Sequence, residues 1–213
     1  MLTRARASIL VLAALTLGAC GNIHPGDAAV VDGQSISMET LNKTAKIYCT
    51  LSGNAAEQQG GPAVSGSDVR RQAVTSLVSV VVARKLARSE GVTVDPVTYN
   101  LTAGQEEQLA KAFPGRDIAK FSQAIEESQE VAEIGIALAE KSTRQVRNST
   151  NERQLSQAGQ LQIVKAFPAN GVRFAPRFGL SPSTKAIADT GSLSVGTGTA
   201  PTGADLPVAQ RCT

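Results

Sequence analysis

The stretch "VRRQAVTSLVSVVVARKLARSEGVTVDP", residues 69–96, carries the strongest evidence on the fold class. Its apolar residues recur every three to four positions, which is typical of a helix with one buried face. We therefore expect a helix that begins at Ser67 or Asp68 and ends near Glu90. The predicted apolar face comprises Val69, Ala73, Leu77, Val80, Val81 and Leu86.

Within this stretch, residues 78–83 ("VSVVVA") have the composition of a β-strand and conflict locally with a helix. The helix is favoured because basic residues near its end suit the negative end of a helix dipole. Gly91 can also adopt the left-handed conformation that ends many helices. Asp95 and Pro96 then predict a new helix start, an N-cap followed by proline at the first helical position. The basic residues are Arg84, Lys85 and Arg88.

A short β-hairpin and a helix are expected ahead of the long helix. Residues 29–31 are expected to form an apolar strand, and residues 35–36 a short second strand that runs back beside it. Asp32 and Gly33 between them are a turn pair that adopts positive φ at little cost. Residues 52–66, which are polar and rich in glycine, are predicted to form a flexible loop. Between hairpin and loop, the helix is capped by Ser37 and its apolar side comprises Met38, Leu41, Ala45 and Tyr48.

Three further helices are predicted after the long one. The first starts at Pro96 and continues to about Ala112, the second reaches Ser142, and the third ends near Phe167. Their apolar residues are Ile118, Phe121, Ala124, Ile125, Val131, Ile134 and Leu138 in the second helix, and Leu155, Leu161, Ile163 and Val164 in the third.

The C-terminal part of the chain changes character. Residues 171–179, "GVRFAPRFG", alternate apolar and basic side chains and are a candidate strand, and residues 191–195, "GSLSV", are another. Residues 196–213 are predicted to be a flexible tail, except where Cys212 pins it. The fold class expected from all these elements is mainly α with a small β element.

The first residues have the pattern of an export signal. Arg4 and Arg6 precede the apolar run "ASILVLAALTLGA", residues 7–19, which is shorter than the roughly 20 residues that cross a bilayer. Residues 1–19 are therefore expected to be a signal peptide.

The residues at the end of this run, "LGAC", resemble the lipobox of bacterial lipoproteins, in which the cysteine is acylated and becomes the new N-terminus. The resemblance implies that Cys20 carries fatty acyl chains such as palmitate, and residues 20–28 are then a polar tether. The alternative is an ordinary signal peptide with a chance cysteine. With the lipobox, the protein is expected at the cell membrane, lipid-anchored on the extracytoplasmic face.

Two cysteines, Cys49 and Cys212, follow Cys20. An exported protein folds where thiols can oxidise, and an even number of remaining cysteines favours one disulfide. Such a bridge would close a loop of about 160 residues and contribute on the order of 5 kcal/mol in the chain-entropy model. The alternative is a pair of free, buried thiols.

Composition argues against several classes of function. The formal charge is +3 and falls to about +1 without Arg4 and Arg6, and the few aromatic residues are scattered, so nucleic acid is not an expected partner. His24 is the only histidine and lies in the expected tether, which removes Ser–His–Asp and Cys–His catalysis. The cysteines lack zinc-site spacing. The sequence therefore predicts no catalytic residue, metal or cofactor.

Two patterns that superficially suggest a site have simpler explanations. The adjacent pairs Glu106 with Glu107 and Glu126 with Glu127 lie on predicted helices, where neighbours point about 100° apart, and are interpreted as solvated faces. Residues 195–203, "VGTGTAPTG", lack the lysine of a phosphate-binding loop, and a proline obstructs the helix that should follow, so they are interpreted as a loop.

Taken together, the lipobox, "AAVVDGQSIS" before a helix, and the stretch quoted first resemble the N-terminal domain of SurA-type envelope chaperones and PrsA-type foldases. The resemblance covers residues 29–140, with further support between residues 152 and 195, where "FAPRFG" and "GSLSV" look like the closing strand region. It implies a helical chaperone domain, residues 29–195, closed by short strands from the N- and C-terminal ends.

One departure from that family limits what the resemblance implies. Members that isomerise proline carry a parvulin domain between the helices and the closing segment, and this chain has neither room for it nor its histidines. Prolyl isomerase activity is therefore not expected. The implied function is that of a non-catalytic chaperone, or holdase, whose clients are unfolded exported polypeptides; the client-binding residues are not identified.

The rival hypothesis is a structural or assembly-partner lipoprotein that binds one specific envelope protein, because a fold does not fix a function. A small-molecule binder is less favoured, since the chain offers few aromatic or convergent polar residues for a pocket.

Overall fold

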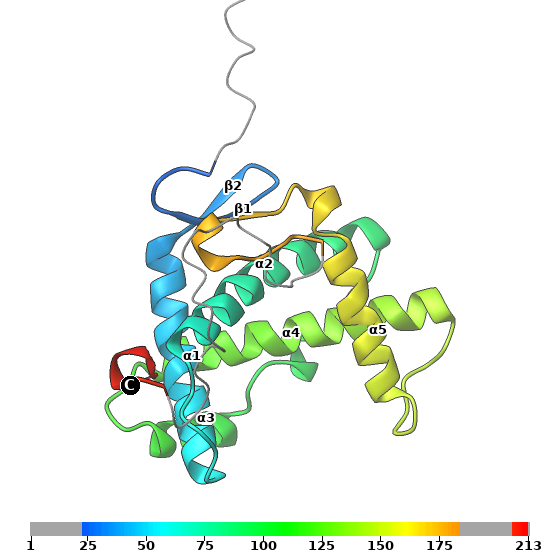
Figure 1. Ribbon diagram of the computed structural model, residues 1–213. Coiled ribbons are helices and arrows are strands. Elements are labelled where there is room, and N and C mark those ends of the chain that lie inside the picture. The colour runs from blue at the N-terminus through cyan, green and yellow to red at the C-terminus, as the bar shows by residue number, and fades with distance from the viewer. Residues whose placement is uncertain (1–22, 184–205, 213) are drawn as a thin grey trace, which may run out of the picture.

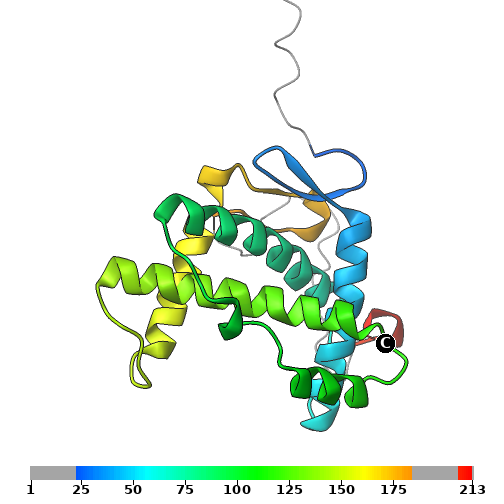
Figure 2. The same ribbon diagram turned by 180° about the vertical axis from the view of Figure 1, so that it is seen from behind.

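The computed structural model describes residues 23–183 and 206–212 (Figure 1). It is mainly helical with one small antiparallel sheet, which confirms the expected fold class. Figures 1 and 2 show α2 and α4 lying side by side, with α1 crossing them near one end and α5 near the other. The helices are α1 (Met38–Gln58), α2 (Gly66–Glu90), α3 (Ala103–Ala112), α4 (Ile118–Thr143) and α5 (Glu152–Lys165).

The sheet has three strands in the order β2-β1-β3, and both pairs are antiparallel. The predicted hairpin is confirmed: β1 (Asp27–Val31) and β2 (Gln34–Ser37) are joined at Asp32 and Gly33, which have φ of 51° and 79°. All five residues of the central strand β1 are buried, and its neighbours include α2. The sheet therefore caps one side of the helices.

The third strand, β3 (Arg173–Phe174), comes from the C-terminal part of the chain and pairs with β1. It lies within the predicted strand of residues 171–179 and is shorter, because Pro176 starts a 3₁₀ turn, η3 (Pro176–Phe178). The predicted alternation holds, since Val172 and Phe174 are buried and Arg173 is exposed. The other candidate strand, residues 191–195, lies outside the described residues.

Helix α1 begins as predicted, with the Ser37 side chain accepting a hydrogen bond from the Thr40 backbone N–H. The prediction of a loop over residues 52–66 is wrong in its first half, because α1 continues to Gln58. The polar residues there form a helical surface, as in the Gln58–Asn54 side-chain hydrogen bond of 2.7 Å one turn apart. Only the residues between Gln58 and Gly66 connect the two helices without regular structure.

The long helix α2 confirms the central prediction, including its end at Gly91 in the left-handed conformation (φ 63°). Its buried face is wider than predicted, because α2 packs against β1, α1, α4 and α5 at once. Three valines absent from the predicted face, Val74, Val78 and Val82, are completely buried. Leu77, Val81 and Leu86 are only half-buried. The valine-rich composition that suggests a strand therefore reflects burial on several sides.

The segment after α2 differs from the prediction of one helix from Pro96 to Ala112. Asp95 caps only a 3₁₀ turn, η1 (Pro96–Thr98), and its carboxylate accepts a hydrogen bond from the Val97 N–H. Helix α3 begins separately, because Thr102 and Gln105 form a reciprocal capping box. Its end at Ala112 agrees with the prediction.

Helices α4 and α5 confirm the two remaining predicted helices, with one exception in the predicted apolar side. Leu161 on α5 is 51% exposed and does not belong to the core. The two helices approach each other closely through Gly135 on α4 and Gly159 on α5. A Cβ atom at position 159 would lie 1.9 Å from the Gly135 carbonyl oxygen, so this crossing requires glycine.

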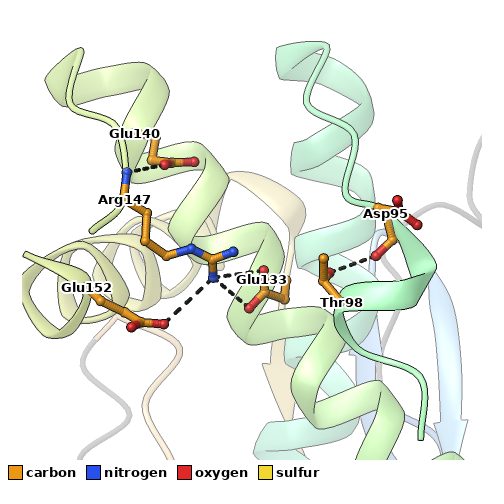
Figure 3. Close-up of polar contacts among 6 residues, drawn as sticks. All are labelled: Asp95, Thr98, Glu133, Glu140, Arg147 and Glu152. Carbon is orange, nitrogen blue, oxygen red and sulfur yellow. Dashed lines mark hydrogen bonds and ion pairs between the residues drawn. The ribbon is translucent and has the colours of Figure 1, made fainter. Parts of the chain in front are cut away.

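The loop between α4 and α5 is held by Arg147 (Figure 3). Its Nη1 donates to both carboxylate oxygens of Glu133, at 2.9 and 3.0 Å, and lies 3.8 Å from Glu152. Its backbone N–H donates to Glu140 at 2.5 Å. The hydrogen bond with Glu133 raises the pKa of Arg147 above its already high value.

Figure 3 also shows a contact at the turn η1. The Thr98 Oγ1 donates a hydrogen bond to the carbonyl oxygen of Asp95, the residue that caps this turn.

Cys49 and Cys212 form the predicted disulfide pair, with Sγ atoms 2.01 Å apart and Cα atoms 5.1 Å apart. The last residues of the chain are attached to the fold in other ways as well: the Cys212 N–H donates to the Val64 carbonyl at 2.9 Å, and Leu206 is 5% exposed. The expectation of a flexible tail therefore needs correction for residues 206–212. Residues 196–205, the expected signal peptide (residues 1–19) and Cys20 lie outside the described residues.

Among the described helices, none combines the length and the apolar character needed to cross a membrane.

The close approach of α4 and α5 predicts that Gly159→Ala lowers the free energy of unfolding by about 1–3 kcal/mol, because the added methyl group overpacks the crossing. Gly53→Ala is the matched control: it lies in α1 with open space around it and should stabilise by up to about 1 kcal/mol. Urea unfolding of the mature domain, with Cys20→Ser in every variant, measures both. Equal stability of Gly159→Ala and the parent would contradict this packing.

The disulfide predicts a second effect on stability. Replacing Cys49 and Cys212 together by serine should lower the free energy of unfolding by about 2–5 kcal/mol, because the bridge closes a long loop in the unfolded chain. Reduction of the parent domain should give the same unfolding curve as the double variant. A double variant as stable as the oxidised parent would show that the bridge does not stabilise the fold.

Candidate functional site

Three adjoining cavities lie along α2 and α4, two of them bordered by α1 and the third by α5, and together we call them the central groove. The middle section has a volume of about 400 Å³, and it shares Ser76 with a section of about 270 Å³ toward the start of α1 and one of about 500 Å³ toward α5. Ser76 therefore marks the centre. The middle section is lined by Tyr48, Leu51, Ser52, Gln72, Ser76, Ala124, Ile125, Ser128 and Gln129.

Figure 2 shows α1 crossing α2 and α4, which lie side by side. On α2, Gln72, Ser76 and Ser79 line it at helical spacing and form a polar stripe beside the buried valines. On α4, the lining runs from Lys120 to Ala132.

The centre of the groove is organised by one hydrogen bond between α1 and α2. The hydroxyl oxygens of Tyr48 and Ser76 lie 2.7 Å apart. Burial raises the pKa of Tyr48 above its ordinary value, so the phenol stays neutral and protonated at physiological pH. Tyr48 was predicted on the apolar side of α1, and its ring is half-buried there.

The middle section of the groove carries no charged lining residue among those described. Charged side chains line the two outer sections, and the cations among them already have partners. Lys43 pairs with Glu39 at 2.6 Å, Lys120 pairs with Asp117 at 2.5 Å, and Arg71 pairs with Asp68. Glu127 lines the section toward the start of α1, where its carboxylate accepts a hydrogen bond from the Gln123 side chain at 3.1 Å. The middle section is therefore the uncharged part of the groove.

The section of the groove toward α5 is lined by hydroxyl and amide groups as well as aliphatic side chains. Thr75, Ser79, Ser156 and Gln160 provide the polar groups, and Val131, Ala132 and Leu180 lie among them. Hydroxyl and amide side chains both donate and accept hydrogen bonds. Such a lining can hydrogen-bond a polypeptide backbone while its aliphatic part contacts apolar side chains. Among the described residues, its one charged lining residue, Arg71, is already paired with Asp68.

Of the histidine and the glutamates singled out in the sequence, only Glu127 lines the groove, in the section toward the start of α1. The His24 backbone N–H donates to the Asp27 carboxylate at 2.9 Å, and the residue is exposed. Glu107 pairs with Lys111 at 2.7 Å on the surface of α3. Glu126 is half-buried rather than fully solvated, because its carboxylate accepts a hydrogen bond from the Leu101 N–H at 2.9 Å. Within the described part of the chain, no three His, Cys, Asp or Glu residues gather as a metal site would require.

The disulfide is the predicted pair that lies beside the groove. Cys49 follows Tyr48 directly and precedes Leu51 and Ser52, which line the middle section. Cys20 and residues 195–203 lie outside the described residues. The groove residues on α2 and α4 were not predicted. The polar stripe of Gln72, Ser76 and Ser79 within an apolar helix is the signal from which they could have been found.

A comparison with known protein families finds no family model that matches this chain. No curated protein and no solved structure matches it either.

The Tyr48–Ser76 hydrogen bond predicts a measurable coupling. Tyr48→Phe and Ser76→Ala should each lower the free energy of unfolding by about 0.5–1.5 kcal/mol, and the double variant should lose little more than either, because both remove the same bond. Urea unfolding of the four proteins completes the cycle.

Ser122→Ala on α4 is the matched control. The Ser122 Oγ is buried and has no hydrogen-bond partner in the described structure, so its removal should leave stability unchanged or raise it. Additive effects of Tyr48→Phe and Ser76→Ala would contradict the coupling.

Proposed function

We propose that this protein is a non-catalytic chaperone, a holdase for unfolded or partly folded exported polypeptides. The central groove is the observation that carries the proposal. It is open, its middle section has no charged lining residue among those described, and its lining combines aliphatic side chains with hydroxyl and amide groups. A holdase needs apolar surface and adaptable hydrogen bonding without tight demands on shape, and this lining supports such a role.

The second part of the proposal is the location. We place the protein at the extracytoplasmic face of the cell membrane, anchored by lipid on Cys20, on the evidence of the lipobox-like sequence. From Cys20 to the start of β1 at Asp27 the chain can span at most about 25 Å. The domain would thus stay near the membrane where exported chains emerge, which raises its effective concentration without any new contact.

The SurA-type resemblance belongs to the same proposal, on the motifs given above and without a parvulin domain. The absence of prolyl isomerase activity is likewise part of the proposal, because the groove presents hydroxyl and amide groups and a neutral phenol rather than charged acids or bases in its middle section.

The proposal predicts that the oxidised mature domain with Cys20→Ser suppresses aggregation. Light scattering of several unrelated envelope proteins, diluted from denaturant, should fall at near-equimolar domain. Ser128→Arg on α4, which places a long charged side chain in the groove, should raise the concentration needed for half-suppression about tenfold. Ala119→Arg, on an exposed part of the same helix, is the control and should act like the parent.

No suppression by the parent domain at several-fold excess would overturn the holdase proposal. Capture of one folded envelope protein, by a domain that does not suppress aggregation, would favour the assembly-partner alternative instead. Thermal unfolding of the two arginine variants keeps a folding defect apart from a blocked groove.

A further inference from the structure

We propose that the central groove recognises its clients through their backbone: it binds extended, uncharged segments with small or aliphatic side chains by hydrogen bonds to their unpaired amides. This inference rests on the proposed holdase function and names the class of polypeptide that the groove takes.

The lining of the middle section supplies the backbone partners. Ser52 on α1, Gln72 on α2, and Ser128 and Gln129 on α4 face one cavity from three helices. A serine hydroxyl or glutamine amide pairs equally well with a peptide N–H or C=O, whichever the client presents. This recognition does not depend on the client sequence, as a general chaperone requires.

The charge distribution selects against ionised client side chains. The nearest cations outside the middle section, Lys43, Lys120 and Arg71, are already paired with carboxylates. A client lysine or glutamate entering the groove would lose hydration and find no unpaired opposite charge in the middle section. The Tyr48 phenol stays protonated and supplies no charge either.

The length of the groove fits a short extended segment. Its α4 lining runs from Lys120 to Ala132, about 18 Å at the rise of an α-helix. An extended chain rises about 3.3 Å per residue, so about six residues lie along it. A folded helix of the same length has its N–H and C=O groups bonded internally and offers few to the groove. Backbone recognition therefore separates unfolded from folded chains.

The test uses fluorescent peptides of about ten residues and the oxidised mature domain with Cys20→Ser. The reference peptide contains Ala, Val, Ser, Thr and Gly. A second peptide carries Lys and Glu at alternate positions with no net charge, and a third replaces alternate backbone amides by esters, which removes N–H donors without adding bulk. Fluorescence anisotropy should show that each modified peptide binds about tenfold more weakly than the reference.

A protein variant links this loss to the groove. Gln72→Leu, which removes an amide of similar size, should weaken binding of the reference peptide but weaken the ester peptide much less, because the two changes remove the same interaction. Gln154→Leu, on an exposed position of α5, is the matched control and should change neither affinity. A purely structural role of Gln72 would weaken both peptides equally.

The outcomes separate this inference from the holdase function. Equal binding of the reference, charged and ester peptides overturns backbone recognition, while suppression of aggregation would still stand. Suppression without peptide binding overturns the inference and places the client site elsewhere. Peptide binding only after deletion of residues 184–205 would assign the groove to that segment, and dimers dispersed by peptide would assign it to a second copy; both results overturn the proposal.

Discussion

Burial of α2 on several sides is the constraint on which the rest of the structure depends. Val74, Val78 and Val82 lie one turn apart and are completely buried, and β1, α1, α4 and α5 all pack around this helix. Each of these neighbours must therefore present an apolar surface to α2. The hairpin does so with a fully buried β1, and α4 and α5 form the other side by crossing at Gly135 and Gly159.

The same helix produces the groove, because only part of its circumference can be covered. Beside the valines, Gln72, Ser76 and Ser79 line the groove instead of the core. The Tyr48–Ser76 hydrogen bond, 2.7 Å long, joins α1 to α2 within that groove. Core and groove are thus two faces of one helix, and a change in the packing of α2 alters both.

Much of the fold could be predicted because its signals are local. The turn at Asp32 and Gly33, the cap at Ser37 and the stop at Gly91 each depend on neighbouring residues. Residues 52–58 were misassigned because their polar, loop-like composition also forms a helical surface, with the Gln58–Asn54 hydrogen bond one turn apart. The long helix expected after Pro96 was wrong because Thr102 starts a new one. The polar stripe on α2 is visible in the sequence, but the Ser and Gln residues on α1 and α4 look like ordinary solvated positions until the three helices are placed together.

Two long-range ties connect α1 with the parts of the fold that surround α2. At its start, α1 follows β2, whose sheet is completed by β3 from the far end of the domain. Further along, Cys49 is bonded to Cys212, whose N–H donates to Val64 just ahead of α2. Without either tie, α1 could move away from α2 and lose the Tyr48–Ser76 contact. An oxidising compartment therefore suits the groove as well as the stability of the fold, because the covalent tie lies directly beside the residues that line it.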